Sequence, residues 1–132
     1  MGKGFRHSRM EVNRGDVVIC AAPGNYGKPR PGVVVQSNLF NPTHQSVVIC
    51  PITSELVDAP LFRVALQPTA ANGLRKPSQV MVDKLIALRS DRIKQRAGTL
   101  GAGEMARIDS ALRLWLDLGS AEDSWLPTPA LR

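Results

Sequence analysis

One arginine of this chain lies where it could bind a phosphate group. Arg30 stands between Pro29 and Pro31, just before the apolar run 33–35. Proline fixes its own φ and favours extended backbone in the residue before it, so Arg30 is expected on stiff chain at the start of a strand. A guanidinium offers five donors in a rigid fork and keeps its charge, which suits phosphate. The alternative interpretation is an ordinary solvated arginine at a strand end.

The composition favours a polyanionic partner. The 132-residue chain has a formal net charge of +6 at pH 7, and 12 of its 17 basic residues are arginine. An excess of positive charge favours nucleic acid or an acidic protein as partner, and arginine is preferred where phosphate is held with defined geometry. The length fits one domain.

Other classes of site find little support in the residue types. Cys20 and Cys50 lie in strand-like apolar runs and are expected to be buried free thiols in a reducing cytoplasm. The histidines His7 and His44 have no companion ligands, so we expect no metal and no cofactor. No apolar run approaches the roughly 18 residues of a membrane span, so no membrane association is expected.

The elements that must position Arg30 are short strands followed by one helix. β-Branched runs between glycine- and proline-rich loops predict strands at 17–20, 32–37, 46–52, 62–67 and 79–85. The second and third are expected to form a hairpin with a long loop, and residues 90–93 a short turn. Apolar residues at three- and four-residue spacing predict a helix from Gly103 to near Leu118; they are Met105, Ile108, Leu112 and Trp115. We expect Trp115 to anchor the core.

This order of elements predicts a mainly β fold with α content, in which a small, strongly bent antiparallel sheet or barrel is capped by the C-terminal amphipathic helix. We expect a flexible basic segment over 1–13, a single domain over 14–119 and a loose tail over 120–132. Such a sheet leaves edges and an apolar patch that a symmetric dimer would cover.

Four segments in order carry a resemblance to a known family. They are residues 14–18, 30–35, 48–54 and 78–85, followed by the closing helix. In this order they resemble the MazF/PemK (also Kid) toxins of bacterial type II toxin–antitoxin modules over roughly residues 12–118. The resemblance implies an SH3-like barrel, a homodimer and a cognate antitoxin. It also implies metal-independent cleavage of single-stranded RNA by the substrate's own 2′-hydroxyl, which leaves a 2′,3′-cyclic phosphate and a 5′-hydroxyl.

The resemblance assigns catalytic roles to three residues. Arg30 matches the arginine that stabilises or protonates the reacting phosphate, and Thr53 matches the threonine that holds it; the alternative for Thr53 is a hydroxyl that caps the strand end. Asp83 is the first candidate for the proton acceptor and His44 the second, although Asp83 could equally be a structural acceptor. The chain departs from the family here, because loop 21–29 has no carboxylate and Met81 replaces the arginine of an Arg-x-Asp pair.

RNA contacts are expected on the loops around this site. Asn25 and Tyr26 offer an amide and a stacking ring, and Lys28, Arg75 and Lys76 offer positive charge. Two alternatives remain. One is a non-enzymatic inhibitor of gyrase like the CcdB toxins, which share this fold, although their terminal Trp-Gly-Ile pattern is missing here. The other is an SH3-like module that binds RNA without cutting it.

Overall fold

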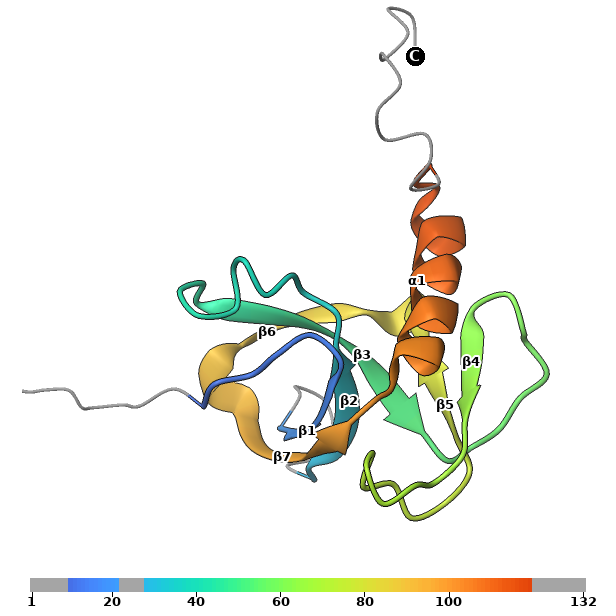
Figure 1. Cartoon of the computed structure of the whole chain (residues 1–132), viewed down its shortest axis with the longest axis horizontal. Helices are drawn as coiled ribbons and strands as arrows, with labels where there is room; N and C mark the ends of the chain where they lie inside the picture. Colours follow the sequence, from blue (N-terminus) through green and yellow to red (C-terminus); the bar gives the residue numbers. More distant parts are fainter. Residues whose placement is uncertain (1–9, 22–27, 120–132) are drawn as a thin grey trace, which may run out of the picture.

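Seven antiparallel strands and one C-terminal helix make up the part of the chain that the computed structural model describes, residues 10–21 and 28–119 (Figure 1). The strands are β1 (Asp16–Cys20), β2 (Arg30–Val34), β3 (Ser46–Thr53), β4 (Arg63–Leu66), β5 (Ser78–Met81), β6 (Ile86–Arg89) and β7 (Ile93–Thr99). Two short 3-10 turns, η1 (Val82–Lys84) and η2 (Ser90–Arg92), and the helix α1 (Ala102–Leu116) complete the fold. The predicted fold class, mainly β with a terminal helix, is confirmed.

The sheet is strongly bent because β3 serves two partners along one of its edges. The strand order is β4-β5-β3-β2-β1-β7, and β6 also pairs with β3. β6 pairs with the first half of β3, from Ser46 to Ile49, whereas β5 pairs with its end, at Ile52 and Thr53. The sheet is not closed: β4 and β7, its outer strands, do not pair with each other in the described residues. The predicted barrel is therefore an open, curled sheet.

The two faces of the sheet cover separate apolar clusters, since alternate side chains of a strand point to opposite faces. The helix-side cluster consists mainly of Val17, Val33, Cys50, Ile52, Val64, Leu66, Val80, Val82, Ile108 and Leu112. The far-side cluster consists of Val12, Val18, Cys20, Val34, Val47, Ile49, Leu88 and Ile93. The far-side cluster draws on β1, β2, β3, β6 and β7, and none of its members comes from β4 or β5.

The helix closes one face of the sheet. α1 packs against β4 and η1 and stands at the β4–β5 end of the sheet (Figure 1). Arg14, in the turn before β1, donates to Asp109 of the helix at 2.6 Å and so ties its middle to the sheet. Trp115 lies on the predicted face, but it packs on the ring of Phe62 at a centroid distance of 5.5 Å and is 47% exposed. It therefore lies at the rim of the core and not inside it.

The strand predicted over 79–85 is shorter than expected, and two observed strands were not predicted. The strand predicted over 79–85 ends at Met81, where η1 turns the chain away from β3. The apolar residues Val82 and Leu85 led to the prediction of a strand over this segment. Val82 is buried in the helix-side cluster, but it lies in the turn η1 and not in a strand. β6 and β7 were not predicted, because most of their side chains are exposed and the sequence shows no apolar alternation there.

Both cysteines are buried and free, as predicted. Burial raises the pKa of the Cys20 thiol to about 11 and that of the Cys50 thiol to about 12. Since the thiolate is the reactive form, neither cysteine is prepared to act as a nucleophile at neutral pH. Among the described residues, no helix has both the length and the apolar composition that crossing a membrane requires.

Candidate active site

A cavity of about 300 Å³ opens on the far face of the sheet, at the place where β3 changes partner from β6 to β5. Its polar lining comes from Arg30, Thr53 and Lys84, and its apolar walls include Cys20, Ile49, Met81 and Ile86. Cys20 and Ile49 belong to the far-side cluster, so a packed core forms one wall of the cavity.

The cavity exists because the strand ladder is interrupted. The pair Ile49 and Ile86 belongs to β6, and the pair Ile52 and Val80 belongs to β5. Between them lies Pro51 on β3, which has no N–H to give to a neighbouring strand. Opposite Pro51, the segment that follows β5 stops pairing with β3 and forms η1. The turn leaves room for a ligand beside β3.

Strand register brings Arg30 and Thr53 together. β2 and β3 pair antiparallel with Gly32 opposite Pro51. Continuing this register by two residues places Arg30 opposite Thr53, on the same face of the sheet. A side chain on Gly32 would collide with its neighbours, since a Cβ there would lie 2.7 Å from Cδ1 of Ile49. The absence of that side chain leaves room for the side chain of Ile49, which lines the cavity.

Thr53 has a structural contact as well as a place in the cavity. Its Oγ1 accepts the backbone N–H of Glu55 at 3.0 Å, which closes a turn at the end of β3. This is the capping role considered above as the alternative. The hydroxyl hydrogen stays available for donation to a ligand, because a hydroxyl both donates and accepts. The two interpretations of Thr53 are compatible.

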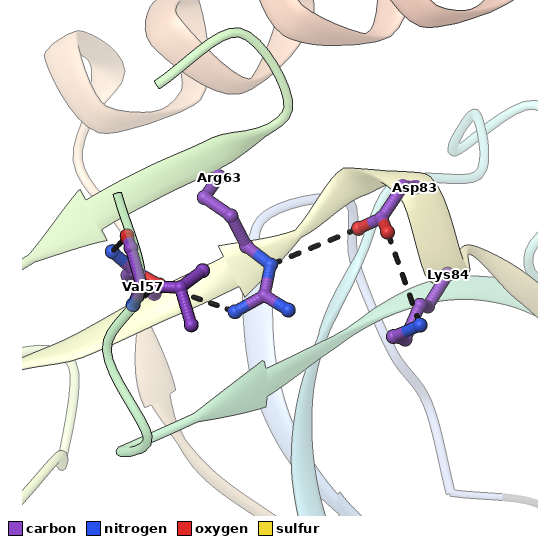
Figure 2. Close-up of polar contacts among 5 residues, drawn as sticks. Val57, Arg63, Asp83 and Lys84 are labelled. Atoms are coloured by element: carbon purple, nitrogen blue, oxygen red, sulfur yellow. Dashed lines mark hydrogen bonds and ion pairs between the residues drawn. The ribbon is translucent and has the colours of Figure 1, made fainter. Parts of the chain in front are cut away.

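Asp83 is not part of the cavity lining, although its chain neighbour Lys84 is. Figure 2 shows its carboxylate between two cations: Oδ1 is 3.8 Å from Nε of Arg63, and Oδ2 is 3.9 Å from Nζ of Lys84. The Asp83 side chain is 16% exposed. Asp83 is therefore placed to interact with two cations and does not face into the cavity.

A guanidinium lies beside Asp83, although position 81 holds a methionine: it is that of Arg63. Arg63 on β4 and Met81 on β5 are cross-strand partners, and the arginine reaches Asp83 from the neighbouring strand. Its Nη1 also donates to Oε1 of Gln79 at 3.2 Å. Gln79 in turn exchanges two hydrogen bonds with the backbone of Val57, which pins the loop after β3. Sequence reasoning missed Arg63, because its relation to Asp83 depends on register alone.

Lys84 is the second residue that sequence reasoning missed. It lies in the segment 78–85 that carried the family resemblance, next to Asp83. The expected strand would have placed Lys84 and Asp83 on opposite faces. In η1, Lys84 instead reaches the cavity with a side chain that is 57% exposed and also contacts Asp83. Only the position of the turn η1 shows that Lys84 lines the cavity.

His44, the second candidate for the proton acceptor, lies at the other end of β3. Its Nδ1 is 3.2 Å from the backbone nitrogen of Ser46, the first residue of that strand. Ser46 and Thr53 are separated by roughly 23 Å at about 3.3 Å per strand residue. The structure therefore does not bring His44 to Arg30.

The predicted RNA-binding residues lie in different places. Asn25 and Tyr26 fall outside the described residues. Lys28 is exposed two residues before Arg30, at the entrance to β2. Arg75 and Lys76 are exposed in the loop between β4 and β5, and neither belongs to the cavity lining that the described residues form. Their contact with RNA stays a prediction.

The sequence of the described domain matches a known family of toxins. Residues 13–116 match the family of PemK-like, MazF-like toxins of type II toxin–antitoxin systems. Since the match spans most of the chain, this protein belongs to that family.

Individual relatives agree with this assignment. The chain is 39% identical over 108 residues to a protein of Mycolicibacterium smegmatis named "Probable endoribonuclease MazF", covering 81% of this chain and 98% of the relative. It is 30% identical over 96 residues to "Endoribonuclease MazF9" of Mycobacterium tuberculosis, covering 69% and 80%. A solved mycobacterial endoribonuclease in complex with its cognate antitoxin superposes with a TM-score of 0.71 at 26% identity, covering 83% of this chain and 98% of that one.

Proposed function

We propose that this protein is a toxin endoribonuclease that cleaves single-stranded RNA without a metal ion. The observation that carries the proposal is the pairing of Arg30 with Thr53 in one cavity of a chain from the MazF-like toxin family. The two curated relatives are both endoribonucleases by name, which supports the same activity here.

The chemistry requires donors more than it requires a protein nucleophile. The 2′-hydroxyl of the substrate attacks the adjacent phosphorus, the bond to the 5′-oxygen breaks, and a 2′,3′-cyclic phosphate and a 5′-hydroxyl result. Negative charge grows on the phosphorane oxygens, where preorganised donors contribute most. Arg30 supplies a fixed charge with several N–H groups, and the Thr53 hydroxyl supplies a neutral donor beside it.

The test is cleavage of a long single-stranded RNA by the purified protein in the presence of EDTA. We expect discrete fragments with 2′,3′-cyclic phosphate and 5′-hydroxyl ends, and sequencing of these ends would give the recognition sequence. An RNA with 2′-deoxy sugar at the cleaved position should stay intact, and the cognate antitoxin should suppress cutting. Intact RNA with folded, antitoxin-free protein would contradict the proposal. Salt-dependent RNA binding without products would then favour the non-catalytic module.

We also propose that the protein acts as a homodimer. The outer strands β4 and β7 leave unpaired edges in the described sheet, and large apolar side chains are exposed near the end of α1 and before β4, namely Leu61, Leu114, Trp115 and Leu118. Light scattering at micromolar concentration is expected to give twice the 14.3 kDa of one chain. A mass of one chain at that concentration would contradict the dimer.

The remaining assignments follow from the same proposal. We take 14–119 as one toxin domain that works in the cytoplasm, with a basic segment before it and a tail after it. The solved relative in complex with its antitoxin supports a cognate antitoxin as partner of this chain. An acidic, disordered segment of the antitoxin would neutralise the positive surface and cover Arg30.

A further inference from the structure

Lys84 lines the same cavity as Arg30 and Thr53, although the sequence did not predict it as a site residue. The ammonium lies at the end of a flexible side chain that is 57% exposed, so it can reach a ligand in the opening. Lysine carries three donors on a compact point charge and binds phosphate as such. The cavity thus holds two cations in its lining, one from β2 and one from η1.

Asp83 restrains this ammonium without neutralising the site. Its two carboxylate oxygens face different cations, Arg63 on one side and Lys84 on the other (Figure 2). One negative charge between two positive charges leaves this group of three residues with a net positive charge. Because the Nζ to Oδ2 distance is 3.9 Å, the ammonium keeps its donors for a ligand.

Arg63 fixes Asp83 from the other side. Its side chain is only 12% exposed and is anchored through Gln79 to the backbone of Val57. A guanidinium in such a position needs a carboxylate close by, since a buried charge is costly without a partner. Asp83 therefore has a structural reason to stay where it is, and that place is outside the cavity lining.

We propose that Lys84 is a second cationic donor to the reacting phosphate and that Asp83 is a positioning residue that holds Lys84. Arg30 and Lys84 then contact different non-bridging oxygens of one phosphodiester, and Thr53 donates from its place beside Arg30. This inference rests on the proposed ribonuclease function, and it replaces the role of proton acceptor predicted for Asp83 from the sequence.

The first experiment compares Lys84→Gln with the wild type in two measurements. Single-turnover cleavage should fall by about ten- to a hundredfold, and Lys84→Arg should recover part of the rate because it keeps the charge. Binding of an RNA with 2′-deoxy sugar at the cleaved position should depend less on salt. The slope of log K against log salt should fall by about 0.7, the value for one phosphate contact on a single strand.

Lys94→Gln is the matched control. Lys94 is exposed on β7, where its ammonium donates to the backbone oxygen of Asp91, and it contributes nothing to the cavity lining. The substitution removes the same charge and should leave both the rate and the salt slope close to the wild type. If Lys84→Gln behaves like Lys94→Gln in both measurements, the assignment of Lys84 is wrong.

The second experiment separates positioning from proton transfer at Asp83. Asp83→Asn should cost less than Lys84→Gln, should add little to it in the double variant, and should keep the acidic limb of the pH–rate profile. Loss of that limb together with an additive effect would identify Asp83 as the base and overturn its positioning role. If Asp83→Asn does not fold, Arg63→Gln combined with Asp83→Asn removes both charges of the buried pair and allows the same comparison.

The two proposals can fail separately. If the wild type does not cut RNA, the ribonuclease proposal fails, and the salt slope of RNA binding still reports whether Lys84 contacts phosphate. If the wild type cuts RNA and neither the rate nor the slope responds to Lys84→Gln, only the present inference fails.

Discussion

Replacing Arg30 by alanine is expected to lower kcat/KM for cleavage of single-stranded RNA by at least about a hundredfold. The guanidinium lines the cavity beside Thr53 and is the residue best suited to the charge that develops on the phosphorane oxygens. Loss of one preorganised donor of this kind commonly costs two to three orders of magnitude in rate. The measurement is single-turnover cleavage of a fluorescent RNA in EDTA at saturating and limiting protein.

Two further variants make this result specific. Arg30→Lys keeps the charge without the planar fork and should fall between the wild type and Arg30→Ala. Arg89→Ala removes an exposed arginine at the end of β6, where it pairs with Asp91 away from the cavity, and should cut RNA at the wild-type rate. An Arg30→Ala protein that stays within fivefold of the wild type would show that the phosphate is stabilised elsewhere.

Ile108→Ala is expected to lower the free energy of unfolding by about 2–5 kcal/mol, the usual range for truncation of a large buried aliphatic side chain. Ile108 is fully buried in the helix-side cluster, where α1 meets the sheet. Urea unfolding at one fixed protein concentration measures the change, since the apparent stability of a dimer varies with concentration.

Ser110→Ala on the same helix is the control for this stability change. Ser110 is exposed and lies outside the apolar patch proposed for the dimer, so its substitution should alter the free energy of unfolding by no more than about 0.5 kcal/mol. Equal effects of the two substitutions would mean that the helix does not pack on the sheet as described.

The sequence predicted the elements whose residues are apolar on at least one face. The β-branched runs of β1, β2 and β3 and the periodic face of α1 were recognisable because burial selects those residues. β6 and β7 lie where few side chains are buried, so their ladder hydrogen bonds leave no trace in the residue types. The turn η1 was not predicted because Val82 is buried like a strand residue although its backbone forms a turn.

The site shows the same division between what residue types reveal and what pairing reveals. Arg30 was predicted as a phosphate ligand from its residue type and flanking prolines, and Thr53 from the resemblance to a toxin family. Their pairing across β2 and β3 follows from register. The relation of Arg63 to Asp83 could not be predicted, because it requires knowing that β4 pairs with β5 and which residue faces Met81. Predicting that Lys84 lines the cavity would have required knowing that β5 ends at Met81.

The interruption of the ladder at Pro51 has a consequence for how such enzymes diversify. Residues 83 and 84 contribute side chains beside the cavity while taking no part in the pairing of any strand. A change at position 84 therefore leaves the register that aligns Arg30 with Thr53 unchanged, whereas a change at position 83 leaves the charge of Arg63 without its partner. The sheet fixes Arg30 and Thr53, and the exposed side chain of residue 84 can alter what the cavity binds at little cost to folding.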